Sequence, residues 1–474
     1  MTSTDFSSMS SAAAKPVRII GKGRKYILWA ILTLFFFIFF PPCTSWFAKP
    51  EEQAQPDDDV AYLHKLLTPF GLTRVPSSAF QVEDGTNLTA VYERLIEEYL
   101  APWAPVLGFA HPPVTTRMLD AMEFPLRKAH FRVRIVDGVV YYRKVAEIKP
   151  NHRVLRINCM LEMMQQTVNE YNITNTEFYV GIGDGPHFRL DTLVNTLGGV
   201  PVFSKRTGYA YIDVPVPDPT EQGCYGNYVI NDTDLPPWNN RIPKAFFRGV
   251  TSQFYLQVDN WHTAQRIKLA QWSEGHPDLL DAGLTSFIHM GDNTAFGPPT
   301  TDEIAKSIGI TLVPPVPIET QTQYKYVIDV DGGLGSSRKS SILKGKSALI
   351  RQDSMFYQHY DPLLRPMQHF VPLDFNLRDI TQIVSFLQRN DALAKRIADA
   401  GHDFAQRHLN LESYRLYWAI LLRRYTALLD NPPRNTSDVG VDACKVYPHE
   451  KESYMAGDMG CSLGWKRWEG TQDS

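Results

Sequence analysis

The segment 325–354 carries the densest group of residues able to bind an anion. A short apolar run, 326–330, is followed by a loop of glycines and hydroxyl side chains: Gly332, Gly333, Gly335, Ser336 and Ser337. Glycines let backbone amides approach a phosphate closely, and the start of the following helix favours negative charge. Arg338, at the mouth of the loop, could bind a phosphate through two parallel hydrogen bonds. The segment predicts a diphosphate-binding loop, with a tight structural turn as the alternative.

Two acidic residues, Asp329 and Asp331, stand before this loop in a D-x-D pattern. Carboxylates so spaced can hold a divalent cation through their oxygens. Because the loop amides and Arg338 could neutralise a diphosphate themselves, we expect a structural role for these acids, with Asp331 at the phosphate site and no metal bound.

Two further charged residues follow apolar runs. Arg248 and Gly249 come directly after the run 245–247, where an arginine would face the crevice in which α/β sheets bind ligands. A surface ion pair is the alternative for Arg248. Asp184 lies between two glycines at the end of the strand predicted in the segment 177–188, and a tight turn there would expose its carboxylate to accept a proton from a hydroxyl group. Acidic residues are common in turns, so the position of Asp184 alone does not decide its role.

The elements that must position these residues follow from the hydrophobic pattern. Apolar runs at 245–247, 326–330 and 347–350 alternate with helical stretches, which predicts a parallel sheet wrapped by helices. Helical periodicity also appears at 91–100 and 157–168, before a β-rich passage at 177–202. The segment 214–244 holds six prolines and indicates a crossing between two domains, with a boundary near Asn240.

The last predicted elements are helices. Asn376 is expected to cap a helix that places Ile380, Ile383, Val384 and Leu387 on one face. A second helix is expected over 391–400, ending at Gly401. A third, within 405–430, is long enough to pack back across another domain.

The N-terminal region indicates a membrane anchor. The stretch 26–47 is mostly apolar and reaches roughly the ~20 residues that a bilayer core requires. Basic residues precede it and acidic residues follow it, which predicts a cytosolic N-terminus, a type II orientation and a lumenal chain beyond a stem at 48–75. Four N-glycosylation sequons, at Asn87, Asn172, Asn231 and Asn435, agree with a lumenal location.

Charge and cysteine content bear on the binding partners and on the disulfide bonds of the chain. The net charge is −3 and the pI about 6.5, which argues against nucleic acid as a partner. Four cysteines follow the predicted anchor and allow three pairings: Cys159, Cys224, Cys444 and Cys461. We favour the Cys444–Cys461 pair, because the two lie close together in the tail.

The stretch from Lys244 to about Leu429 resembles glycosyltransferase family 90, which includes protein O-glucosyltransferases and capsule-associated xylosyltransferases. The resemblance rests on FRG at 247–249, KYVIDVDG with SSR at 336–338, QDSMFYQHY at 352–360 and LLRPMQHFVPL at 363–373; FYVGIGDGPH at 178–187 matches in the first half. It implies an α/β fold of GT-B type, with two Rossmann-like domains facing a cleft. It also implies an inverting reaction with a UDP-sugar donor and no metal, Asp184 as general base, and Arg248 and Arg338 as diphosphate ligands.

We therefore expect an enzyme that moves glucose or xylose from a UDP-sugar to a glycan or protein hydroxyl at the Golgi or endoplasmic reticulum membrane. The alternative is an inactive member that binds glycan or acts as a scaffold. The expected donor-site residues are Arg248, Gly249, Asp331, Gly333, Gly335, Ser336, Ser337 and Arg338. The expected parts are a cytosolic tail (1–25), anchor (26–47), stem (48–75), acceptor-side domain (76–240), nucleotide-sugar domain (241–404), C-terminal helix (405–430) and tail (431–474).

Overall fold

The computed structural model describes the helices, strands and connections that surround the predicted site. It covers residues 87–103, 114–122, 130–144, 151–186, 200–209, 211–218, 221, 230, 232–252, 263–287, 305–306, 308–434 and 466–467. The predicted anchor 26–47, the stem 48–75 and the pair Cys444–Cys461 lie outside these residues. Cys159 is disulfide-bonded. Within the described ranges, no helix combines the length and the apolar character needed to cross a bilayer.

The first half of the chain contains a six-stranded mixed sheet in the order β13-β2-β1-β3-β4-β6. Its strands are β1 (His130–Val136), β2 (Val139–Lys144), β3 (Thr176–Gly181), β4 (Val202–Ser204), β6 (Val214–Pro215) and, from the C-terminal tail, β13 (Lys466–Arg467). Strands β3, β4 and β6 run parallel, whereas β1 pairs antiparallel with both β2 and β3. The expectation of a Rossmann-like first domain is therefore correct only for the β3-β4-β6 side.

A hairpin explains the antiparallel part of this sheet. Asp137 and Gly138 join β1 to β2, and both have positive φ angles, 50° and 76°. Two-residue hairpin turns of this kind favour Asp-Gly, because the second residue takes such angles without strain. The Asp-Gly pair between two apolar stretches was a readable signal, and it accounts for the departure from a parallel domain.

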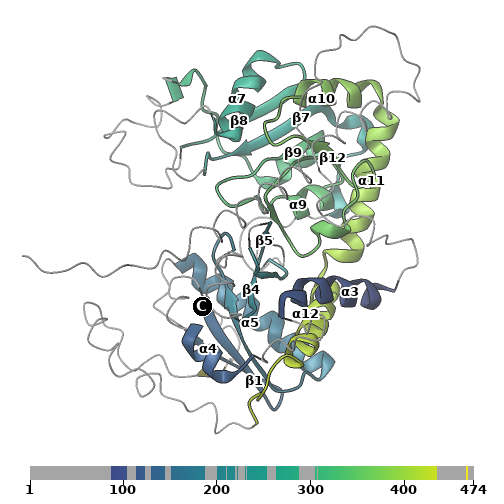
Figure 1. Ribbon diagram of the computed structural model, residues 1–474. Helices are drawn as coiled ribbons and strands as arrows, with labels where there is room; N and C mark the ends of the chain where they lie inside the picture. The colour runs from purple at the N-terminus through teal and green to yellow at the C-terminus, as the bar shows by residue number, and fades with distance from the viewer. Residues whose placement is uncertain are drawn as a thin grey trace, which may run out of the picture. The chain divides into compact units, whose positions relative to one another are not determined.

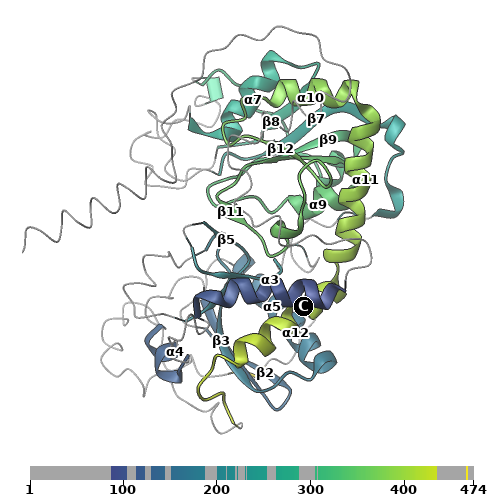
Figure 2. The ribbon, with the colours of Figure 1, turned by 45° about the vertical axis from the view of Figure 1, so that its right-hand side comes forward.

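Among the described residues, four helices pack around the first sheet and its edges: α3 (Leu88–Leu100), α4 (Thr116–Met122), α5 (Asn151–Tyr171) and α12 (Leu411–Thr426). The C-terminal helix α12 contacts α3, α5 and β3, so the chain returns to its first half, as Figures 1 and 2 show. Trp418 of α12 is fully buried against Phe178 and Phe203 of the sheet. The helix predicted within 405–430 therefore packs on the first half of the chain, as α12.

The second half contains a five-stranded parallel sheet in the order β12-β10-β9-β7-β8. The strands are β7 (Ile242–Gly249), β8 (Leu280–Leu284), β9 (Tyr324–Asp329), β10 (Ala348–Gln352) and β12 (Val371–Leu373). This sheet confirms the predicted parallel architecture. The strand order reverses between β7 and β9, and ligands of such sheets bind beyond the carboxyl ends of the strands at that point. Both Gly249 and the loop after Asp329 lie there.

The helices that the structure describes in the second half are α7 (Gln265–Gly275), α9 (Lys339–Lys344), α10 (Ile380–Arg389) and α11 (Asp391–His408). Short 3-10 helices in both halves cover Ala101–Trp103, Asp232–Asp234, Trp238–Asn240, Ile318–Gln323 and Asp361–Leu363.

The predicted cap of α10 is wrong: its N-cap is Asp379. The amide of Asn376 instead donates to Asp374, whose carboxylate organises the turn before the helix.

The predicted end of α11 at Gly401 is also wrong, because the helix continues to His408. A Cβ at Gly401 would lie 2.9 Å from the carbonyl oxygen of His369 and 2.9 Å from a methyl group of Leu343. The glycine therefore allows the helix to pass close to its neighbours. Close packing requires it here, and the helix does not end at it.

A two-stranded antiparallel ribbon joins the halves. Its strands are β5 (Thr207–Gly208) and β11 (Phe356–Tyr357), and the amide of Tyr209 donates to the carbonyl oxygen of Met355 at 3.3 Å. Figure 2 shows β5 and β11 adjacent. The segment that contains Asp184 is thereby held near the loops of the parallel sheet.

Candidate active site

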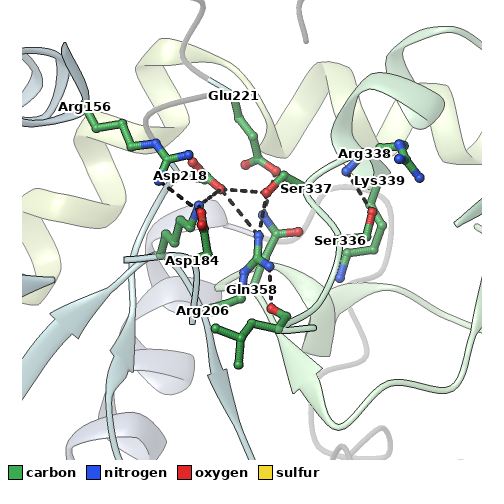
Figure 3. A network of polar contacts seen from close by, with 12 residues as sticks. Arg156, Asp184, Arg206, Asp218, Glu221, Ser336, Ser337, Arg338, Lys339 and Gln358 are labelled. Carbon is green, nitrogen blue, oxygen red and sulfur yellow. Dashed lines mark hydrogen bonds and ion pairs between the residues drawn. The ribbon is translucent and has the colours of Figure 1, made fainter. Parts of the chain in front are cut away.

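Asp184 lies in the bend that follows β3, and its side chain is 54% exposed. Its Oδ1 accepts hydrogen bonds from Nη1 of Arg156 on α5 and from Nζ of Lys205 after β4, both at 3.0 Å (Figure 3). Burial by itself would raise the pKa of Asp184, but the charges of Lys205 and Arg156 outweigh it and hold the pKa well below its ordinary value. The group is therefore an ionised carboxylate throughout the neutral range.

Arg206 extends the network from Asp184 to the glycine-rich loop. Its Nη1 donates to the carbonyl oxygen of Leu334 at 2.5 Å, and its Nη2 donates to Oγ of Ser337 at 2.5 Å. The buried carboxylate of Asp218 lies 3.8 Å from both Lys205 and Arg206 and accepts a hydrogen bond from Ser337. The structure therefore brings Asp184 and the predicted phosphate loop into one polar cluster, as Figure 3 shows.

The loop itself packs directly against the turn that contains Asp184. A Cβ at Gly185 would lie 2.7 Å from a methyl group of Leu334, so the missing side chain permits this contact. Gly335 has a φ of 87°, a left-handed conformation that glycine adopts without strain. The amide of Gly333 donates to the carbonyl oxygen of Ser252 at 2.5 Å, and Oγ of Ser336 accepts from the amide of Arg338 at 3.3 Å. The loop conformation is thus fixed by local bonds.

Of the two acids before the loop, Asp331 is hydrogen-bonded to neighbouring residues and Asp329 is buried. The hydroxyl of Ser354 donates to the Asp331 carboxylate, and the amide of Asp331 donates to Gln352 at 2.8 Å. Burial raises the pKa of Asp331 to about 6, although the Ser354 hydrogen bond opposes the shift. Asp329, at the end of β9, is buried. The hydrogen bonds of Asp331 thus support the start of the loop.

The two predicted arginines lie over opposite faces of β7. The guanidinium of Arg338 sits 4.6 Å from the ring centre of Phe247, in space that a Cβ at Gly249 would occupy. Arg248 instead lies 5.0 Å from the ring centre of Phe246 and donates to Oδ1 of Asp281 at 2.6 Å. Because side chains alternate along a strand, the structure does not bring Arg248 and Arg338 together.

A buried network supports the turn that follows β10. Lys339 forms an ion pair with Asp361, whose Oδ2 also accepts the amide of Gln358 at 2.6 Å, and Gln358 donates to Glu221 at 2.7 Å. Burial raises the pKa of Glu221 to about 7. His359 is buried among tyrosine rings, and burial lowers its pKa to about 3, so this histidine packs as a neutral ring.

Sequence reasoning missed the residues that connect the two halves of the site. Arg156, Lys205 and Arg206 all contact the cluster, while the buried Arg266 donates to the carbonyl oxygens of Val250 and Val330 and so fixes the ends of β7 and β9. The adjacent basic residues 205–206 directly after an apolar run were a visible signal. Arg156 and Arg266 lie on helices, where charged residues give no such signal.

This geometry places an ionised, exposed carboxylate beside a loop that can receive an anion. The sequence pattern of the family described as Glycosyl transferase family 90 matches residues 86–459. Human protein O-glucosyltransferase 3 is 28% identical over 283 residues, 57% of this chain and 51% of that protein. The O-glucosyltransferase rumi homolog of Aedes aegypti is 28% identical over 368 residues, 71% of this chain and 84% of that protein.

The O-glucosyltransferase rumi of Drosophila melanogaster is 28% identical over 198 residues, 41% of this chain and 42% of that protein. The chain spans about half the length of protein O-glucosyltransferase 3 and of several other curated relatives it matches. The family match, in contrast, covers most of the chain, including the five-stranded sheet, every strand of the first sheet except β13, and the Asp184 cluster. The resemblance noted in the sequence is thereby confirmed, and the chain belongs to glycosyl transferase family 90.

Proposed function

We propose that this chain is an inverting glycosyltransferase that moves a sugar, glucose or xylose, from a UDP-sugar to a hydroxyl group of a glycan or protein acceptor. The observation that carries the proposal is the juxtaposition of Asp184 with the 331–338 loop through Lys205 and Arg206. A base must lie close to the bond that its substrate forms, and an anion site must lie close to the bond that breaks. Family membership supports the same chemistry.

The proposed reaction is a single displacement. The acceptor oxygen attacks the anomeric carbon, its proton passes to Asp184, and the bond between that carbon and the diphosphate oxygen breaks, so UDP leaves with the electron pair. One displacement inverts the anomeric centre. Both described hydrogen bonds to the Asp184 carboxylate end on Oδ1. Among the described residues Oδ2 accepts none, which makes it the oxygen for the acceptor hydroxyl.

The leaving diphosphate is assigned to the loop. Backbone amides at 334–337, the hydroxyl of Ser336 and the Arg338 guanidinium would stabilise the growing negative charge. The Gly333 amide and the Ser337 hydroxyl already donate to Ser252 and Asp218, so these two groups hold the loop in place. Asp331 is bonded to Ser354 and supports the loop, so the proposed site uses these donors in place of a metal. Arg248 could reach the diphosphate only if its ion pair with Asp281 opened.

The proposed cellular setting rests on the sequence. The anchor 26–47 would hold the N-terminus in the cytosol and place residues beyond the stem in the Golgi or endoplasmic reticulum lumen. The partners would be a UDP-sugar, a glycan or protein acceptor and the lipid bilayer, without nucleic acid.

The test uses the full chain, purified in detergent, with UDP-glucose, UDP-xylose and other UDP-sugars in turn. We expect UDP release that depends on an acceptor, and a product whose anomeric configuration is opposite to that of the donor by NMR. A peptide and an oligosaccharide acceptor distinguish the two acceptor classes. UDP-sugar binding without any transfer across the panel would contradict catalysis and support the non-catalytic alternative. Retention of configuration would contradict single displacement.

A further inference from the structure

Arg206 joins the half of the chain that carries Asp184 to the glycine-rich loop of the other half. Its side chain is 4% exposed, and both terminal nitrogens donate to the loop, to the carbonyl oxygen of Leu334 and to Oγ of Ser337. A Cβ at Gly335 would lie only 3.1 Å from Nη1 of Arg206. The backbone of the loop is therefore shaped around this guanidinium.

The same arginine belongs to the charge network of Asp184. The Asp218 carboxylate lies 3.8 Å from Nη2 of Arg206 and 3.8 Å from Nζ of Lys205, and Lys205 donates to Asp184 at 3.0 Å. Ser337 closes the network by donating to Asp218 at 3.2 Å. A continuous set of ion pairs and charge-assisted hydrogen bonds thus runs from the carboxylate of Asp184 to the loop. The hydrogen bonds from Arg206 to the loop are stronger than neutral ones, whereas the two contacts of Asp218 at 3.8 Å are ion pairs without a hydrogen bond.

We propose that Arg206 is a positioning residue that fixes the 331–338 loop relative to Asp184. The inference rests on the proposed function, because it assigns the loop to the diphosphate and Asp184 to the acceptor hydroxyl. Arg206 acts through Leu334 and Ser337, since both terminal nitrogens of its guanidinium already donate to the loop. Its removal would let the loop shift while leaving the phosphate ligands themselves in the chain.

The planar guanidinium explains why an arginine is needed. Two nitrogens of one rigid group reach two acceptors, Leu334 and Ser337, at the same time. A lysine carries a similar charge as a single ammonium on a flexible stem, so it would retain the attraction to Asp218 and lose the fixed two-point contact. Arg206→Lys should therefore restore part of what Arg206→Met removes.

A matched control is available in Arg241, which is also buried and also donates to backbone carbonyl oxygens and to a serine. Its Nη1 contacts the carbonyl oxygens of Gly345 and Lys346 at 3.0 Å and 2.7 Å, and Oγ of Ser347 at 3.2 Å. Arg241 lies at the amino end of β7, however, whereas the loop follows the carboxyl end of the parallel strand β9. Arg241→Met should lower stability without changing UDP affinity.

The experiment measures UDP affinity by calorimetry, together with kcat and the KM values for donor and acceptor, all in the full chain. The variants are Arg206→Met, Arg206→Lys, Ser337→Ala, the double variant that combines Arg206→Met with Ser337→Ala, and the control Arg241→Met. We expect Arg206→Met to weaken UDP binding by about tenfold to a hundredfold, the scale of one or two lost charge-assisted bonds, and to raise the donor KM but not the acceptor KM. Arg206→Lys should fall between Arg206→Met and wild type. The double variant should bind UDP about as weakly as Arg206→Met alone, because both changes break one contact.

Three results would overturn the inference: wild-type UDP affinity in Arg206→Met, additive losses in the double variant, or an equal loss in Arg241→Met, which would indicate general destabilisation. The proposed function fails separately. A wild-type chain that binds UDP but transfers no sugar contradicts the function, and the affinity comparison still decides the role of Arg206. A wild-type chain that does not bind UDP contradicts both.

Discussion

Replacing Asp184 by asparagine changes the chemistry of the site with little change in its geometry. Asparagine has nearly the same size as aspartate, and its carbonyl oxygen can accept the hydrogen bonds that Arg156 and Lys205 donate to Oδ1. The substitution removes the negative charge and the ability to take a proton. A defect in Asp184→Asn would therefore report on the base and not on a displaced turn.

The expected effects have opposite signs for catalysis and for binding. A general base contributes about 10²-fold to 10⁴-fold, so kcat should fall by that factor. The cluster holds three cations, Arg156, Lys205 and Arg206, and two carboxylates, Asp184 and Asp218, so its net charge rises from +1 to +2. One added charge about 8 Å from a bound anion is worth roughly 0.5 kcal/mol in a water-like dielectric, so UDP should bind about twofold more tightly.

Single-turnover transfer and calorimetric UDP titration measure these two quantities. Asp120→Asn is the matched control, because Asp120 is also partly exposed and accepts a hydrogen bond from the buried Arg132 at 2.6 Å in the same half of the chain. We expect the control to keep kcat within about twofold of wild type, as for a substitution remote from the reacting atoms.

Two outcomes would refute the reasoning. Turnover in Asp184→Asn above about a tenth of the wild-type value would show that another group accepts the proton, since a base contributes at least about 10²-fold. UDP affinity reduced strongly in Asp184→Asn would show that the carboxylate supports the donor loop itself.

Three other substitutions test separate parts of the structure. Gly249→Ala would place a methyl group against the Arg338 guanidinium, so calorimetry should show UDP affinity reduced by about threefold to tenfold; unchanged affinity would contradict a requirement for the observed position of the Arg338 guanidinium in UDP binding. The pKa of Asp331 is raised to about 6 in the folded chain, against about 3.9 in the unfolded chain. The unfolded chain therefore loses this proton first, and the free energy of unfolding falls as the pH rises from about 4 to 6. The amide of Asp331→Asn can still accept the hydrogen bond from Ser354, so urea titrations should show a free energy of unfolding that this substitution raises by roughly 1–3 kcal/mol more at pH 7 than at pH 4. Equal effects at both pH values would contradict a raised pKa of the buried carboxyl group. Gly401→Ala should lower the unfolding free energy by about 1–3 kcal/mol through overpacking against neighbours of α11, and a neutral result would show that the helix can move aside.

Local patterns identified most of the parallel sheet and the loop beyond its switch point. The runs that became β7, β9 and β10 were readable because buried parallel strands are nearly continuous apolar segments. The first sheet is mixed and not parallel because the Asp137-Gly138 turn joins β1 and β2 as a hairpin. Gly401 does not end its helix, and a glycine required for close packing looks the same in sequence as one that terminates a helix.

The sequence by itself determined the loop, the exposed acid after β3 and the family, because each depends on residues adjacent in the chain. Only the tertiary structure decided which arginines serve the cluster. Arg206 meets Leu334 and Ser337 across separations of 128 and 131 residues, and no local pattern predicts such a contact. Arg248 is one residue from Phe247, yet the pleat of β7 turns its side chain to the opposite face, toward Asp281. Alternation along a strand is visible in sequence, but packing alone decides which face meets the loop.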